Sequence, residues 1–160
     1  MATRKNKKRS AHKNGLDAVA LLKADHRQVA AWFKAFEATK SAARKTDLAE
    51  KICKALTVHT QVEEEIFYPA FLKQAKDKDL HHEAVVEHGG AKFLIAQIQK
   101  SGPRDDYFDS KVHVLSEMIK HHVKEEEQPG GMFAEAKKAG MDLKELGQEM
   151  GARKKDLMAR

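Results

Sequence analysis

Apolar residues recur at steps of three and four along four stretches of the chain, which is the spacing of one face of an α-helix. Breaks in this pattern fall near residues 40–43, 76–79 and 101–105. The pattern predicts four amphipathic helices. The apolar positions are Val19, Leu22, Val29, Phe33 and Phe36; Leu48, Ile52, Leu56, Val62 and Ile66; Ala84, Val85, Ala91, Ile95 and Ile98; and Val114 or Leu115 with Met118.

Each stripe also contains a histidine at a place where the period expects an apolar residue. These are His26, His59, His88 and, in the fourth stretch, His121 or His122. A single histidine on an apolar stripe is usually a hydrogen-bonded core residue. Four of them, one in each predicted helix, indicate a shared site instead.

The chain resembles itself at an offset of 62 residues. Residues 59–65 match residues 121–127, each a histidine followed four residues later by three glutamates, and the acid–histidine pair at 25–26 matches that at 87–88. Three anchor points with one offset indicate two copies of a helical hairpin. If the chain reverses at each break, the histidines return to one level. We therefore predict an all-α fold: an up-down-up-down antiparallel four-helix bundle with short C-terminal extra helices.

The spacing of histidine and glutamate is that of metal ligands on a helix. Residues four apart share a helical face, so His59 with Glu63, and His121 with Glu125, can each present a nitrogen and a carboxylate to one point. Imidazole suits iron, zinc, copper and nickel, and a carboxylate can bridge two ions. Periodicity alone also allows His122 with Glu126 as the second pair, whereas the offset selects His121 with Glu125.

The other glutamates of the two runs have simpler interpretations. Three consecutive glutamates cannot all face solvent on one helix, because they cover roughly 200° of its circumference. We expect Glu65 and Glu127 to be solvated. For Glu64 and Glu126 a hydrogen bond to a ligand histidine is the alternative to solvation.

In this order the motifs resemble the hemerythrin HHE cation-binding domain family. They are Asp25-His26-Arg27, His59-x3-Glu63 with the following Ile-Phe-Tyr-Pro, Glu87-His88 and His121-x3-Glu125, and the resemblance runs from about Leu16 to Arg160. It implies a four-helix bundle around a non-haem centre of two iron ions with an oxo or hydroxo bridge. By resemblance the metal ligands are His26, His59, Glu63, His88, His121 and Glu125.

One departure from the family changes the expected function. Oxygen-carrying hemerythrins place two histidines one turn apart on the third helix, but Ala84 and Lys92 stand one turn before and after His88. This puts reversible oxygen carriage in doubt. The resemblance leaves binding of dioxygen, peroxide or nitric oxide for sensing, storage or detoxification. The alternatives are an enzyme that disproportionates hydrogen peroxide and a structural metal-binding bundle without redox chemistry.

Charge and composition predict the segments of the chain and the compartment in which the protein resides. The net charge of +6 comes from residues 1–14, since the remainder has equal numbers of basic and acidic residues. We expect residues 1–14 to be a disordered tail whose contact with nucleic acid is at most weak, residues 15–128 to form the bundle, and residues 129–160 to be a helical extension packed on it. A single cysteine and no long apolar run predict a cytoplasmic protein without a membrane span.

Overall fold

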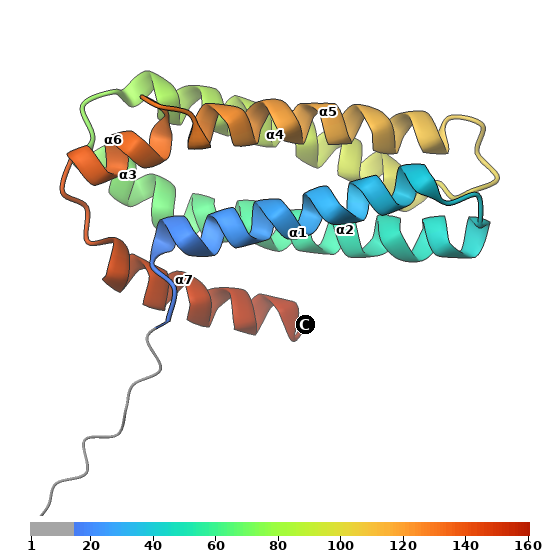
Figure 1. Cartoon of the computed structure of the whole chain (residues 1–160), viewed down its shortest axis with the longest axis horizontal. Helices are drawn as coiled ribbons and strands as arrows, with labels where there is room; N and C mark the ends of the chain where they lie inside the picture. The colour runs from blue at the N-terminus through green and yellow to red at the C-terminus, as the bar shows by residue number, and fades with distance from the viewer. Residues whose placement is uncertain (1–14) are drawn as a thin grey trace, which may run out of the picture.

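The computed structural model describes residues 15–160 (Figure 1), so the predicted basic tail lies outside the described residues. Within that range the prediction of an all-α fold is confirmed, because every regular element is a helix. The elements are α1 (Ala18–Ala38), α2 (Ala42–Val62), a π-helix η1 (Glu63–Phe67), α3 (Tyr68–Gln74), α4 (Lys78–Lys100), α5 (Phe108–Glu127), α6 (Met132–Lys138) and α7 (Leu143–Met158).

The four long helices α1, α2, α4 and α5 lie side by side, and each runs opposite to the one before it (Figure 1). The chain reverses over residues 39–41, 75–77 and 101–107, close to the predicted breaks. Asp17 and Ser41 cap the first two helices by accepting hydrogen bonds from the backbone amides of Ala20 and Arg44. We refer to these four helices together as the bundle.

The apolar core consists of two clusters with the histidines between them. One cluster includes Leu22, Val62 and Ala84, and the other includes Val29 and Leu56. On α1, α2 and α4, the apolar stripe passes from one cluster to the other at the histidine. The histidines of successive helices therefore lie at one level inside the bundle, and apolar side chains shield that level from both ends.

The second helix changes its winding at Glu63, the first glutamate of its run. In η1 the amide of Tyr68 donates to the carbonyl of Glu63, a step of five residues. Pro69 follows at once, and its ring removes a backbone donor and crowds the carbonyl four residues earlier. The wider π-turn accommodates this proline without ending the helix. It also places Glu63 and Tyr68 on the same side, although five residues in an α-helix would separate them by about 140°.

The C-terminal helices cover one end and one side of the bundle. Pro129 and Gly130, whose φ is 76°, turn the chain after α5. The buried side chains Met132 and Phe133 of α6 then close the end of the bundle nearest the α3–α4 turn. Helix α7 packs along α1 and α2, on the side away from α4 and α5 (Figure 1). Of the helices in residues 15–160, none combines the length and apolar character that crossing a bilayer needs.

Close backbone contact sets the docking of α7, and this generates a test. A β-carbon at Gly147 would lie 2.4 Å from the carbonyl oxygen of Leu16, whereas one at Gly151 would make an ordinary 3.7 Å contact with Leu21. We expect Gly147→Ala to lower the free energy of unfolding by about 1–3 kcal/mol through overpacking. Gly151→Ala, the matched control on the same helix, should instead add up to about 1 kcal/mol through helix propensity. Urea denaturation of both variants measures this, and equal stability would contradict the packing.

Candidate metal centre

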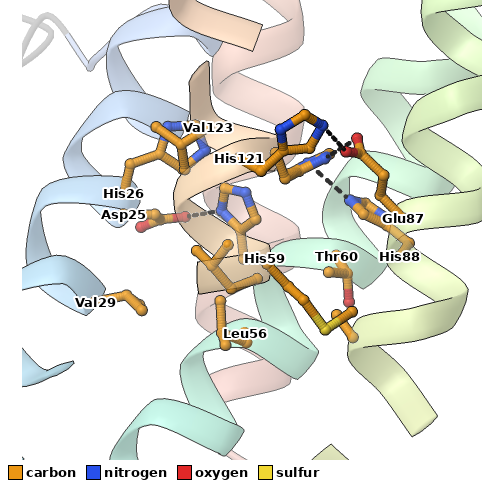
Figure 2. A pocket seen from close by; sticks show the side chains of 14 residues that line it. Asp25, His26, Val29, Leu56, His59, Thr60, Glu87, His88, His121 and Val123 are labelled. Atoms are coloured by element: carbon orange, nitrogen blue, oxygen red, sulfur yellow. Dashed lines mark hydrogen bonds and ion pairs between the residues drawn. The ribbon is translucent and has the colours of Figure 1, made fainter. Parts of the chain in front are cut away.

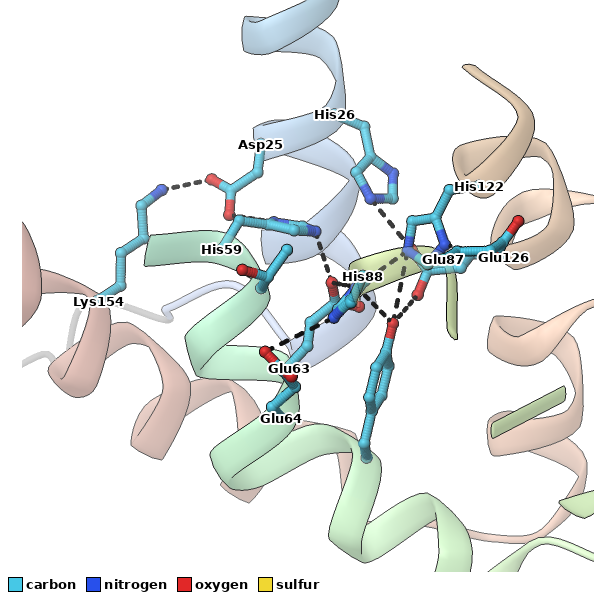
Figure 3. Close-up of polar contacts among 12 residues, drawn as sticks. Asp25, His26, His59, Glu63, Glu64, Glu87, His88, His122, Glu126 and Lys154 are labelled. Carbon is cyan, nitrogen blue, oxygen red and sulfur yellow. Dashed lines mark hydrogen bonds and ion pairs between the residues drawn. The ribbon is translucent and has the colours of Figure 1, made fainter. Parts of the chain in front are cut away.

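Four imidazoles, one from each helix of the bundle, converge in its interior (Figure 3). They belong to His26 on α1, His59 on α2, His88 on α4 and His122 on α5, and each residue is at most 8% exposed. The rings form two pairs. The centroids of His26 and His59 lie 5.0 Å apart, and those of His88 and His122 lie 4.8 Å apart.

Glu63 contacts one imidazole of each pair. Its Oε1 lies 2.8 Å from Nε2 of His59 and 3.4 Å from Nε2 of His88. The residue is fully buried. Of the three glutamates in the first run it is therefore the one that faces the interior, as the sequence predicted.

Glu126 does the same from the opposite side of the site. Its Oε1 lies 3.3 Å from Nε2 of His26 and 3.3 Å from Nε2 of His122, and the residue is 1% exposed. Two sets of three ligand atoms result, each with all atoms within 4.8 Å of one another: His26, His59 and Glu126; and Glu63, His88 and His122.

The fourth helix differs from the prediction made from the 62-residue offset. The side chain of His121 is 66% exposed and contacts Glu87, and Glu125 lies near Gln128 rather than in the interior. The pair that faces the centre is His122 with Glu126. The physical reason is the turn length. Residues 39–41 connect the first two helices, whereas the longer turn 101–107 connects α4 and α5. An offset of 62 that fits His26 and His88, which precede these turns, is therefore too short by one residue for the helices that follow them.

A second set of carboxylates orients three of the imidazoles from outside. Asp25 lies 2.9 Å from Nδ1 of His59, and Glu87 lies 2.9 Å from Nδ1 of His122. Glu127 lies 3.0 Å from Nδ1 of His26. A carboxylate at Nδ1 holds the N–H there and leaves the Nε2 lone pair directed inward.

These contacts decide the remaining predictions for the glutamate runs. Glu127 is exposed, as expected, and it also hydrogen-bonds His26 on the neighbouring helix α1, which the sequence did not predict. Glu64 lies 3.7 Å from Nδ1 of His88, near enough for an ion pair but not for a hydrogen bond. Glu65 faces outward, as expected, and pairs with Arg153 of α7.

The inner atoms fit a cation. Both oxygens of Glu63, Oε1 of Glu126 and the Nε2 atoms of His26 and His59 are buried without a hydrogen-bond partner, although some of them lie close together. Unpartnered carboxylate oxygens in an apolar interior are costly. A metal ion satisfies both kinds of atom, because imidazole nitrogen and carboxylate oxygen are common metal donors.

In the metal-free protein, protons on two of the imidazoles supply positive charge beside the buried glutamates. Burial alone would lower the pKa of His59, but Glu63 and Asp25 outweigh it and raise that pKa to about 10. Burial would also lower the pKa of His122, but the carboxylates of Glu126 and Glu87 outweigh it and raise that pKa to about 11. Without metal, both imidazoles are cations at neutral pH and hold the buried glutamates by charge.

Tyr68 is a residue of the centre that sequence reasoning missed. Its hydroxyl lies 3.0 Å from Nε2 of His88 and donates to Oε2 of Glu126 at 3.2 Å. Burial, together with the charges of Glu63 and Glu126, raises the pKa of the phenol well above its usual value. The hydroxyl therefore keeps its proton. Its position depends on the π-turn of η1, which helical periodicity does not predict.

A cavity of about 210 Å³ adjoins the imidazoles (Figure 2). Its apolar lining comes from all four helices of the bundle: Val29, Leu56, Ala91, Met118, Ile119 and Val123. His121 lines it too and is largely exposed, so this side chain marks the outer end of the cavity. The cavity is large enough for a molecule of a few atoms next to the centre.

Comparisons with known proteins agree with this geometry. Residues 17–129 match the family described as "Hemerythrin HHE cation binding domain". The crystal structure of an HHE cation-binding domain-containing protein from Mycobacterium kansasii has the same fold, with a TM-score of 0.74 at 20% identity over 89% of this chain and 87% of that one. A protein called "DNA nickase" from Nostoc sp. is 25% identical over 118 residues, 72% of this chain and 32% of the nickase. The chain thus spans about a third of that relative's length.

Matched alanine variants test which acids and imidazoles belong to the centre. We expect Glu126→Ala and His122→Ala to reduce bound metal, because each removes a donor atom from the interior. Glu125→Ala and His121→Ala, their neighbours on the same helix, should leave the metal content unchanged. Elemental analysis of purified protein measures the metal per chain. Normal metal content in Glu126→Ala together with loss in Glu125→Ala would overturn the ligand assignment.

Proton release tests the electrostatics of the metal-free centre. The raised pKa values mean that His59 and His122 carry protons at pH 7, and a metal ion must displace both. We expect zinc binding to release at least about two protons per chain, and affinity to fall as the pH is lowered. Calorimetric titration in two buffers of different ionisation enthalpy counts the protons. Binding without proton release would contradict the predicted ion pairs.

Proposed function

Because the chain belongs to the hemerythrin HHE cation-binding family, we propose that it holds two iron ions in a non-haem, oxo- or hydroxo-bridged centre within an up-down-up-down antiparallel four-helix bundle. The observation that carries this proposal is the placement of two buried carboxylates, each between imidazoles of different pairs. A carboxylate in that position can bridge two ions.

In this proposal each pair of imidazoles holds one ion. His26 and His59 would bind the first and His88 and His122 the second, with Glu63 and Glu126 reaching both. The separation of the rings into two pairs, with centroids about 5 Å apart inside each pair, favours two ions over one. When bound, iron supplies redox chemistry and an affinity for dioxygen, peroxide or nitric oxide.

The surrounding residues bind and protect the small ligand. The apolar cavity next to the imidazoles admits a small neutral molecule and disfavours bulk water. The hydroxyl of Tyr68 donates its one proton to Glu126, and it can turn that proton toward an oxygen held beside this carboxylate instead. These features support binding of dioxygen, peroxide or nitric oxide for sensing, storage or detoxification.

The chain offers no second histidine on α4 at the level of the centre. Ala84 is buried in the apolar cluster on one side of His88, and Lys92 pairs with Glu64 on the other. Reversible oxygen carriage of the five-histidine kind is therefore not part of the proposal. The relative called a nickase does not extend the proposal to DNA cleavage, since this chain matches only 32% of it.

Disproportionation of hydrogen peroxide is the second candidate, and the protonated Tyr68 favours it. Peroxide chemistry needs a proton donor close to the reacting oxygens, and this hydroxyl lies among the inner ligand atoms with its proton retained. A structural metal site without redox chemistry is the third candidate.

A reducing compartment such as the cytoplasm suits the single buried thiol of Cys53.

Iron loading followed by ligand titration separates these functions. Protein made with iron present is expected to contain about two irons per chain and to show oxo-bridge absorption bands that change on adding nitric oxide or peroxide. Oxygen evolution from peroxide, lost in Tyr68→Phe at unchanged iron content, would select the enzyme. A colourless protein that binds one zinc ion and only gains thermal stability would contradict the di-iron proposal.

A further inference from the structure

The outer face of α4 is apolar and uncovered in the described part of the chain. Val86 is 75% exposed and Phe93 is 68% exposed. Helix α7 covers the outer side of α1 and α2, but the helices that pack on α4 are α2, α3 and α5, which lie on its inner side (Figure 1). The two hairpins of the bundle thus differ, since the first has a covering helix and the second has none among residues 15–160.

The exposed face follows the pattern of a helix–helix contact. Its residues recur at alternating steps of three and four along the whole of α4, and every one is exposed. The middle of this face is apolar or small and its two ends carry opposite charges, so it can pack against a second helix along its length. The residues are Asp79, His82, Val86, Gly89, Phe93, Ala96 and Lys100.

The glycine at the centre of this face has no role in the packing of the single chain. A β-carbon at Gly89 would meet nothing within 4 Å, whereas one at Gly90 would lie 2.9 Å from the Met118 side chain of α5. A glycine inside a helix costs stability relative to alanine. Packing within the chain explains Gly90 but not Gly89, and a close approach by another backbone would explain it.

The charges of α4 complement those of a second, antiparallel copy of the same helix. When the two-fold axis passes midway between Gly89 and Gly90, residues equally distant from these two glycines face each other across it. Val86 then meets Phe93 of the other copy, since each is three residues from the pair, and Asp79 meets Lys100, since each is ten residues away.

Glu83, an exposed acid beside this face, fits the same register, since it faces Ala96 of the other copy. Glu87 and Lys92 take no part, because Glu87 hydrogen-bonds His122 and Lys92 pairs with Glu64 within the chain. In this register the exposed acidic groups of α4 meet a base or a neutral side chain. Like charges do not oppose one another, which is the arrangement that specific helix pairs use to exclude wrong registers.

We propose that the protein forms a two-fold symmetric dimer in which α4 packs antiparallel against α4 of a second copy, with the helices crossing between Gly89 and Gly90. The contact is isologous, because the same residues contribute from both copies. It lies outside the ligand cluster and does not depend on the identity of the bound metal.

The size of the full chain in solution tests this proposal first. Analytical ultracentrifugation is expected to show a species of twice the 18.0 kDa chain mass, with a dissociation constant that rises about thirtyfold or more in Phe93→Lys. Met158→Lys is the matched control, because Met158 is an exposed apolar residue at the end of α7; this variant should dimerise like the natural chain. A monomer at all concentrations, or a dimer unaffected by Phe93→Lys, would overturn the proposal.

Gly89→Glu is expected to weaken dimerisation without lowering the stability of the monomer. The open space around Gly89 and the better helix propensity of glutamate predict unchanged or higher thermal stability of the monomer. At the crossing, however, the two new carboxylates would both lie next to the two-fold axis, and their repulsion would dissociate the dimer. Retained dimerisation in this variant would show that the helices do not cross beside Gly89.

Charge reversal tests the register. Asp79→Lys and Lys100→Asp should each weaken the dimer, by about tenfold at low salt, because each puts like charges opposite one another twice per dimer. The double variant exchanges the charges and is expected to restore the affinity of the natural chain. A double variant no tighter than the single ones would overturn the antiparallel register.

Discussion

The structure depends on holding two carboxylates inside an apolar bundle. Glu63 and Glu126 are buried among four imidazoles, with an apolar cluster on each side of that level. A buried carboxylate is tolerated only when cations or donors surround it. The imidazoles of His59 and His122 meet this demand in the metal-free state by taking up protons, and their nitrogens are free to bind metal when those protons leave.

This constraint explains features that otherwise look unrelated. The π-turn of η1 keeps Glu63 and Tyr68 on one face despite Pro69. Outer carboxylates hydrogen-bond Nδ1 of three imidazoles, so that each Nε2 points inward. Lys154 of α7 in turn contacts Asp25, the partner of His59 (Figure 3). The C-terminal helices therefore take part in positioning the centre as well as covering the bundle.

Much of this arrangement could be predicted from the sequence, because helical periodicity reports which face of each helix is buried. It identified the inward positions of His26, His59 and Glu63. It failed on the fourth helix because the choice of His121 came from an offset between hairpins, and the longer turn before α5 shifts that offset by one residue. Tyr68 was missed for a related reason, since a π-turn interrupts the α-helical period from which the inward positions were predicted.

The most direct test of the account is the position of the metal itself. A crystal structure of iron-loaded protein, with anomalous difference density collected at the iron edge, is expected to show two peaks per chain. One should lie between His26 and His59 and the other between His88 and His122, with Glu63 and Glu126 contacting both. A single peak, or density beside His121 and Glu125 instead, would contradict the proposed centre.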